Sequence, residues 1–249
     1  MQIITRSTAT RAASAAAALL LARLADTPSL TIGLPTGHTP IPLYRALARA
    51  HRAGRADFSK AVTFNLDEFA GLGAGDPGSY HSYMTSHLFS QVNLRAGHTH
   101  VLDGRAKDWR AEAARYEGLI ARAGGLDIVI LGIGRNGHLG FNEPGATLAS
   151  RTRRVALRPQ TRRANAALFG DRWQDVPTHA LSMGIGTILT ARCAVLLATG
   201  ASKARIVSRA LTGPITTRVP ASLLQVHPHV IVVLDRAAAG ALPADIRRG

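Results

Sequence analysis

The sequence has one cysteine, few aromatic residues and no long apolar run, and each shortage excludes a class of protein. The single cysteine, Cys193, rules out an intramolecular disulfide framework and is typical of a reducing compartment, so we expect a cytoplasmic protein. Aromatic residues make up 5% of the 249 residues, so any core must consist mainly of aliphatic side chains. No run reaches the roughly 18 apolar residues of a membrane span, so we expect no membrane partner.

Acidic residues and lysine are also scarce. The chain has 15 Asp and Glu against 30 Lys and Arg, a net charge of +15, and its only lysines are Lys60, Lys107 and Lys203. A nucleic-acid-binding protein of this charge needs a clustered basic surface, often interleaved with aromatic residues. The one dense basic run, 151–163, contains no aromatic residue. We therefore expect no nucleic-acid partner, and interpret the charge as a solvated arginine-rich surface that also suits an anionic small molecule.

The first thirty residues allow two interpretations. The apolar run 15–22 resembles the hydrophobic part of a secretory signal, although it is too short to span a bilayer. Alternatively, residues 1–5 form a strand and residues 12–25 a helix that Ser7 or Thr8 caps. We favour the second interpretation, because a turn-forming segment and another apolar run follow directly.

Short apolar runs rich in Val, Ile and Leu alternate with amphipathic stretches along the chain. This pattern is typical of strands buried on both faces of a parallel sheet. It predicts an α/β fold in one domain over residues 1–249: a single doubly wound, mostly parallel, Rossmann-like sheet with helices on both faces. The expected strands are 30–35, 62–66, 126–133, 193–199 and 230–235, and the expected helices are 41–52, 79–91, 109–123, 185–190 and 201–211.

Two turns between a strand and a helix are suited to an anion. In 34–40, LPTGHTP, a glycine allows close backbone approach, while Thr36 and Thr39 supply hydroxyl groups at a helix start. In 199–203, TGASK, Lys203 lies where a cation opposes the helix dipole, which makes sense if it meets an anion. An ordinary turn and a surface lysine remain the alternatives.

Two other segments that follow strands carry acid–base groups. In NLDEF, 65–69, one of the adjacent carboxylates Asp67 and Glu68 could act as a general base, or either could cap a helix. In LGIGRNGHLGFNEPG, 131–145, His138 can titrate near neutral pH, and Glu143 can set its tautomer. A dinucleotide site is not expected, because Pro144 breaks the helix that such a site requires. No residue cluster predicts a metal site.

These segments, in this order and spacing, resemble the glucosamine-6-phosphate deaminase family. The matching stretches are LPTGHTPIPLYRAL, VTFNLDEFAGL, GSYHSYM, LGIGRNGHLGFNEPG, LASRTR and TGASKA, and the likeness extends to about residue 235. The related 6-phosphogluconolactonases share the fold and a GxxGH loop but do not normally continue with FNEPG.

The resemblance implies an isomerising deaminase of amino-sugar breakdown that yields fructose 6-phosphate and ammonia without a metal or organic cofactor. It implies that His138 opens the sugar ring with Glu143 orienting it, and that Asp67 moves a proton from carbon 2 to carbon 1. Asn136 stands where many members have an aspartate, which leaves Glu143 as the charged support of His138. The residues that the resemblance assigns to the phosphate are Thr36, Gly37, His38, Thr39 and Lys203.

The chain also departs from the family pattern. Ala167 stands where the family has a phosphate-binding arginine, and Arg162 or Arg163 could replace it. Residues 157–177 could form a lid over the substrate. The positions associated with allosteric control are mostly changed, and the chain stops soon after its last strand, so we expect a monomer or small homo-oligomer that binds a phosphosugar.

Three functions follow from these observations. The first is deamination of glucosamine 6-phosphate. The second is a related phosphosugar reaction, by a galactosamine-6-phosphate deaminase or a 6-phosphogluconolactonase-like enzyme. The third is a non-enzymatic sugar-phosphate-binding module. Ammonia release measured across these substrates separates them.

Overall fold

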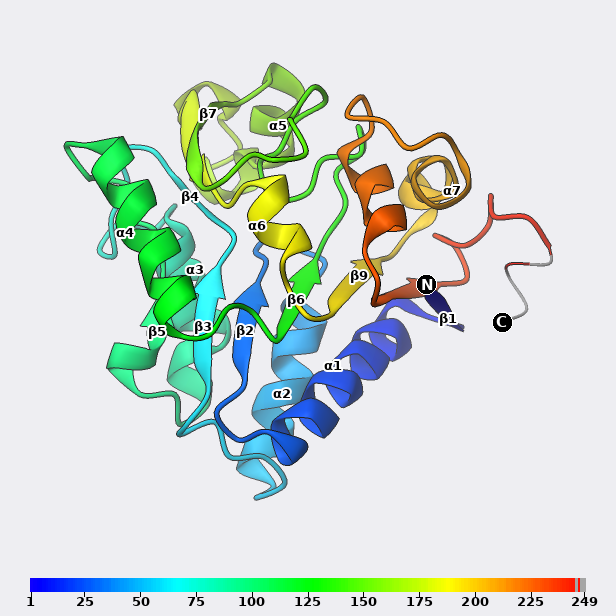
Figure 1. The fold of residues 1–249 in the computed structure, drawn as a ribbon, viewed down its shortest axis with the longest axis horizontal. Helices are drawn as coiled ribbons and strands as arrows, with labels where there is room; N and C mark the ends of the chain where they lie inside the picture. The colour runs from blue at the N-terminus through cyan, green and yellow to red at the C-terminus, as the bar shows by residue number, and fades with distance from the viewer. Residues whose placement is uncertain (245, 247–249) are drawn as a thin grey trace.

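A seven-stranded parallel sheet forms the centre of the computed structural model, which describes residues 1–244 and 246 (Figure 1). Every strand pair in it is parallel, so the expected doubly wound α/β sheet is confirmed. In spatial order the strands are β1 (Gln2–Arg6), β10 (Val230–Asp235), β9 (Ala194–Ala198), β6 (Ile128–Leu131), β2 (Thr31–Leu34), β3 (Val62–Asn65) and β5 (Thr99–His100).

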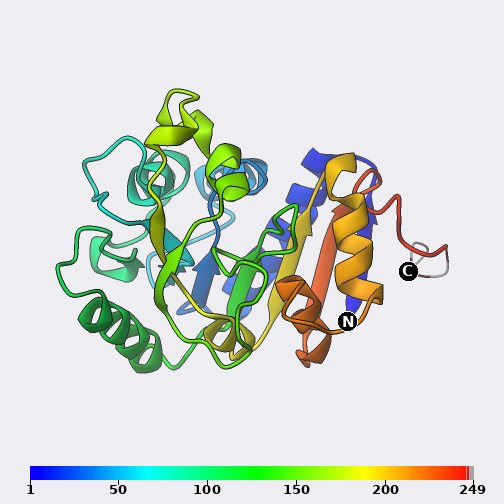
Figure 2. The same ribbon diagram turned by 90° about the horizontal axis from the view of Figure 1, so that it is seen from above.

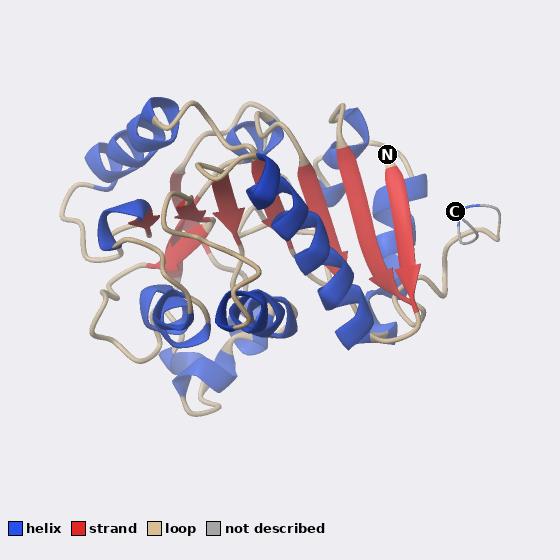
Figure 3. Cartoon of the chain, turned by 90° about the horizontal axis from the view of Figure 1, so that it is seen from below, coloured by secondary structure: helices blue, strands red, loops and turns tan. Residues whose placement is uncertain are grey.

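Helices cover both faces of this sheet, as Figure 3 shows. One face carries α1 (Ala9–Asp26), α2 (Ile41–Arg52) and α3 (Tyr80–His87), and the other carries α4 (Trp109–Arg122), α6 (Ile185–Leu189) and α7 (Ala204–Thr212). Two expected helices are shorter than predicted. The stretch 79–91 ends as a helix at His87 and continues as a 3-10 turn, Phe89–Gln91, and the stretch 201–211 begins with a 3-10 turn, Ala201–Lys203.

The core lies on both faces of the sheet because alternate side chains of each strand point to opposite sides. In β10, Val232 and Leu234 pack under α7, while Val233 packs with α1 on the other face. A strand buried in this way reads as a continuous apolar run, which is the signal that located it.

Residues 1–26 form β1 and α1, as the second interpretation of this segment predicted. The Thr8 hydroxyl accepts a hydrogen bond from the backbone N–H of Arg11 and so caps α1. Small buried residues such as Ala12 and Ala16 let the helix lie close to the sheet. Among the residues that the structure describes, no helix combines the length and apolar character needed to cross a membrane.

A second sheet of three antiparallel strands was not predicted. It consists of β4 (Asp67–Phe69), β8 (His179–Ser182) and β7 (Arg153–Ala156), in that order. The strands are short, and β4 pairs with residues more than 100 positions away, so no local pattern indicates them. The stretch between β7 and β8 contains α5 (Pro159–Ala164) and two 3-10 turns, Ala166–Phe169 and Trp173–Asp175, and projects from the main sheet (Figure 2).

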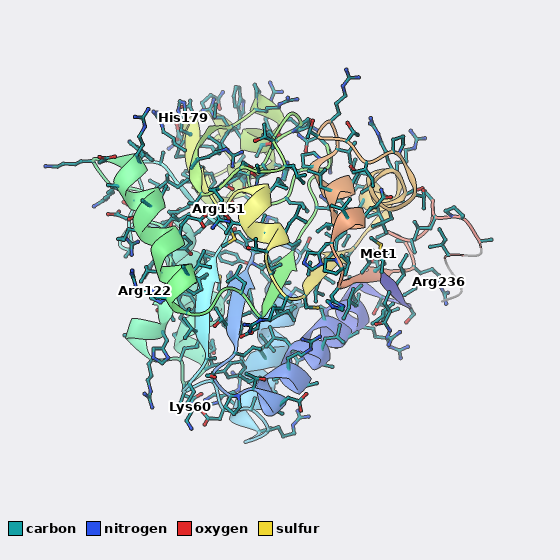
Figure 4. The ribbon with its side chains drawn as sticks, viewed as in Figure 1. Met1, Lys60, Arg122, Arg151, His179 and Arg236 are labelled. Carbon is teal, nitrogen blue, oxygen red and sulfur yellow. The ribbon has the colours of Figure 1, made fainter. Side chains whose placement is uncertain are left out.

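The strand order reverses beside β2. The chain passes from β2 to β3 on one side and later places β6 on the other, so the loops that follow β2 and β6 diverge. In open α/β sheets such a divergence leaves a crevice at the carboxyl ends of the strands. Lys60, Arg122 and Arg236 lie on separate parts of the molecule (Figure 4).

Candidate active site

A cleft of about 850 Å³ lies at this crevice, within the size range of small-molecule sites. Its wall is built from the loops after β2 and β6, from the start of β4, and from α5. Glu143 and Arg162 do not line it. The predicted site residues that do line it are Thr36, Gly37, His38, Thr39, Asp67, Asn136, His138, Arg163 and Lys203.

Two tyrosine hydroxyl groups anchor the loop 35–40 between β2 and α2 by hydrogen bonds to its backbone. Tyr83 donates a hydrogen bond to the Gly37 carbonyl at 2.5 Å, and Tyr44 donates one to the Pro35 carbonyl. Gly37 has a φ of +91°, a conformation that glycine adopts without steric cost. The two anchored carbonyls fix the loop, and its threonine side chains line the cleft.

Asp67 begins β4 and is 5% exposed. Within the described residues its carboxylate makes no hydrogen bond and no ion pair, and its Oδ1 atom is fully buried. Burial, and secondarily the neighbouring Glu68, raises the pKa of Asp67 from 3.8 to about 8. A carboxyl group with a pKa near the operating pH is suited to take up and release a proton.

Glu68 points away from the cleft, because successive side chains of a strand face opposite sides. It accepts hydrogen bonds from the backbone N–H groups of Phe69, Tyr80 and His81 at 2.7–2.9 Å, and so caps the start of α3. Burial raises the pKa of Glu68 to about 7, although these three N–H groups oppose the shift. Of the two adjacent carboxylates, Glu68 is therefore used by the fold and Asp67 faces the cleft.

His138 is supported by a carboxylate that lies just outside hydrogen-bonding distance. The His138 Nδ1 atom is 3.8 Å from the Glu143 Oε2 atom. Asn136 joins the two residues, since its amide donates to Glu143 at 2.7 Å and its carbonyl accepts the His138 backbone N–H at 3.2 Å. The His138 ring lies over Gly134, where a Cβ atom would come within 2.2 Å of the ring.

Glu143 is also held by a residue that sequence reasoning missed. The Thr161 hydroxyl donates a hydrogen bond to the second carboxylate oxygen of Glu143. Burial acts to raise the pKa of Glu143, but His138, Thr161 and Asn136 outweigh it and lower the pKa to about 2. Glu143 therefore stays ionised at neutral pH. Thr161 lies six residues before Ala167, in the segment whose family counterpart ends in the phosphate-binding arginine, and this position was the available signal.

Lys203 closes the cleft on the side of α7. Its Nζ atom donates a hydrogen bond to the Ile133 carbonyl at 2.6 Å, which leaves two further donors on the ammonium group. Burial, and secondarily Arg135, lowers the pKa of Lys203. Arg135 also lines the cleft. It was not predicted, because a single arginine among loop glycines carries no local signal of a binding role.

The two arginines expected to replace the family arginine differ in position. Arg162 is excluded as a cleft residue, because its guanidinium donates to the carbonyls of Val176 and Gln174 at 2.8 Å. Arg163 lines the cleft, with its guanidinium carbon 4.8 Å from the centre of the Trp173 ring. Ala167 lines the cleft as well and contributes no charge there.

No metal-binding arrangement is found within residues 1–244 and 246, where no three His, Cys, Asp or Glu side chains come close enough to hold an ion. The sequence contains two His-x-His pairs, His98 with His100 and His227 with His229. One histidine of each contacts a backbone carbonyl: His98 contacts that of Ala61 at 3.1 Å, and His227 that of Ala191 at 2.7 Å.

The cleft thus combines an anion-suited loop and lysine with a buried base and a carboxylate-supported histidine. This arrangement defines a site for acid–base chemistry on a small anionic molecule.

Comparison with known proteins agrees with this description. The family model of glucosamine-6-phosphate isomerases/6-phosphogluconolactonase matches residues 5–232. A glucosamine-6-phosphate deaminase of Rhodopirellula baltica is 48% identical over 93% of this chain and 92% of its own length. Glucosamine-6-phosphate deaminase 2 of Bacillus subtilis is 46% identical over 90% of both chains.

Solved structures give the same assignment. A monomeric glucosamine-6-phosphate deaminase superposes with a TM-score of 0.94 at 42% identity, covering 97% of this chain and all of the other. The 6-phosphogluconolactonase of Trypanosoma brucei, at 20% identity and a TM-score of 0.76, shares the fold. The chain belongs to the glucosamine-6-phosphate isomerase/6-phosphogluconolactonase family.

Proposed function

We propose that this protein is a glucosamine-6-phosphate deaminase, which converts glucosamine 6-phosphate and water into fructose 6-phosphate and ammonia. Relatives that bear this name are 46–48% identical over at least nine-tenths of the chain. The lactonases found among the solved structures share about 20% of the sequence. The reaction belongs to amino-sugar breakdown.

The geometry supports the following sequence of steps. His138, with ionised Glu143 behind it, moves the proton that opens the sugar ring. Asp67 removes the proton from carbon 2 of the open aldehyde and returns it to carbon 1. The oxygen on carbon 1 gains a proton and the nitrogen on carbon 2 loses one, so carbon 1 becomes an alcohol and carbon 2 an imine. Water adds to that imine, and ammonia leaves. The chain would supply only acid and base groups to these steps.

The observation that carries the proposal is the state of Asp67. A buried carboxylate without a hydrogen-bond partner is costly for a fold, and here it faces a cleft shared with His138 and Lys203. An isolated group of this kind is best explained by a function that needs its basicity.

Two assays test the proposal: ammonia release from glucosamine 6-phosphate and from galactosamine 6-phosphate, and acid release from 6-phosphogluconolactone. We expect turnover of glucosamine 6-phosphate, and a fall in kcat of about 10²- to 10⁴-fold for Asp67→Asn. Asp26→Asn, at the exposed end of α1, is the matched control and should keep the wild-type rate. A wild-type protein no faster than Asp67→Asn, or one that prefers the lactone, would contradict the proposal.

We also propose three further properties. Residues 157–177 act as a lid, since α5 lines the cleft and Thr161 reaches Glu143. The protein works as a monomer, like the monomeric glucosamine-6-phosphate deaminase that superposes on it with a TM-score of 0.94. It resides in the cytoplasm, which is in keeping with a lone, buried, free Cys193.

A further inference from the structure

The cleft contains more positive charge than its predicted phosphate residues account for. Lys203 and Arg135 both line it, and the charge of Arg135 lies close enough to lower the pKa of Lys203. The two cations are linked through the same loop, because Lys203 donates to the carbonyl of Ile133, two residues before Arg135. The only acidic side chain in the cleft wall is Asp67.

Arg135 has no role in the fold that would explain its place. Within residues 1–244 and 246 its guanidinium makes no hydrogen bond, no ion pair and no contact with an aromatic ring, and the residue is exposed. Two like charges held over one cavity repel each other, and a bound anion removes this repulsion. A guanidinium is also well suited to an anion such as phosphate, because it can donate two parallel hydrogen bonds.

The other candidate cation in the cleft wall, Arg163, is packed on an aromatic ring. Arg163 lies over the Trp173 ring, in the 157–177 segment rather than in the loop after β6. Arg135 lies between the glycines of that loop, beside Asn136, and lines the same cleft as the lysine.

We propose that Arg135 and Lys203 together bind the phosphate of the substrate, and that Arg135 supplies the guanidinium that Ala167 does not. This assignment rests on the proposed function, because it takes the anion to be the phosphate group of a sugar phosphate. It makes Arg135 a substrate-binding residue with no part in the proton transfers.

The variant Arg135→Gln tests the assignment, with Arg205→Gln as the matched control, because Arg205 is an exposed arginine of α7 outside the cleft wall. Two measurements are needed: the KM and kcat for glucosamine 6-phosphate, and the affinity for inorganic phosphate from the rise in Tm that it causes. The second measurement requires no activity.

For Arg135→Gln we expect a KM about 10- to 100-fold higher, a similar loss of phosphate affinity, and a smaller change in kcat. Its Tm without phosphate should match the wild type, because the side chain makes no contacts that the fold needs. Arg205→Gln should change none of these values by more than about twofold.

The assignment is overturned if Arg135→Gln keeps the wild-type KM and phosphate affinity, or if Arg163→Gln weakens both more than Arg135→Gln does. Failure of the proposed function is a separate result. If the wild type releases no ammonia, the deaminase proposal fails. If the Arg135→Gln substitution still lowers the affinity for phosphate, the anion site is supported independently.

Discussion

At the scale of single residues, the two neighbouring carboxylates Asp67 and Glu68 have different surroundings. Asp67 and Glu68 are both buried, and burial raises the pKa of each. Glu68 is compensated by three backbone N–H groups, whereas Asp67 has no such partner in the described structure. The uncompensated group is the one that faces the cleft, so the fold keeps a destabilising residue where the proposed reaction needs a base.

The raised pKa of Asp67 predicts that Asp67→Asn is more stable than the wild type at high pH. The group has a pKa of about 8 when folded and 3.8 ordinarily, so the folded protein binds this proton more tightly than the unfolded chain. The wild type therefore loses stability as pH rises from about 4 to about 8, and the variant is spared this loss. The Tm of the variant minus that of the wild type should grow by at least about 3 °C between pH 5 and pH 9.

Asp26→Asn, which changes an exposed carboxylate, should show no such pH-dependent difference. The same pKa predicts that kcat/KM of the wild type rises with pH and levels off above about 8, because the proposed base is the ionised carboxylate of Asp67. A Tm difference that is equal at both pH values would show that burial does not perturb Asp67 in this way.

At the scale of elements, the small antiparallel sheet and α5 complete the site. β4 positions Asp67, and α5 carries Thr161, whose hydroxyl reaches Glu143. Tyr80, at the start of α3, donates to the Asn165 side chain at 3.2 Å and so links the segment after α5 to the rest of the cleft wall. The two contacts connect the 157–177 segment to both sides of the cleft.

A lid made from residues 157–177 predicts that ligand binding protects this segment. We expect its backbone amides to exchange hydrogen more slowly in the presence of fructose 6-phosphate, measured by mass spectrometry, because a bound sugar adds contacts to α5. The amides of α1, which packs on the far side of β9 and β10, serve as the internal control and should not change. Equal exchange of 157–177 with and without the sugar phosphate would argue against a lid.

At the scale of the whole molecule, the described surface exposes few large apolar side chains and carries a high positive charge. The exposed large apolar residues of the described chain are Met1, Leu148, Ile215 and Val226, at separate places in the sequence. The net charge of +15 also favours repulsion between copies.

We accordingly expect a monomer. Light scattering coupled to gel filtration at about 0.15 M salt should give a mass close to 26.3 kDa across a tenfold range of protein concentration. A mass that doubles or rises further with concentration would contradict this expectation. Adding fructose 6-phosphate in a parallel run tests whether ligand binding changes the result.

Much of the fold could be predicted because its signals are local. Buried parallel strands are continuous apolar runs, so β10 was located to the residue, and an amphipathic pattern located α2 equally well. Glycine-rich turns after strands indicated where the cleft lies, since parallel strands all end at one edge of the sheet. The sequence by itself therefore determined six of the seven strands of the main sheet, all but the two-residue β5, and the helices on its faces. It also placed Asp67, His138 and Lys203 at the edge of the sheet where the structure has them line one cleft.

Only the tertiary structure decided the features that depend on distant pairing. β4 pairs with β8 across more than 100 residues, and this pairing turns Asp67 into the cleft and Glu68 toward α3. The choice among arginines was equally non-local: the Arg162 guanidinium donates to the carbonyls of Val176 and Gln174, while Arg135 lines the cleft together with Lys203. Side-chain direction, burial and unpaired charge arise when separate segments meet, and no pattern of neighbouring residues encodes them.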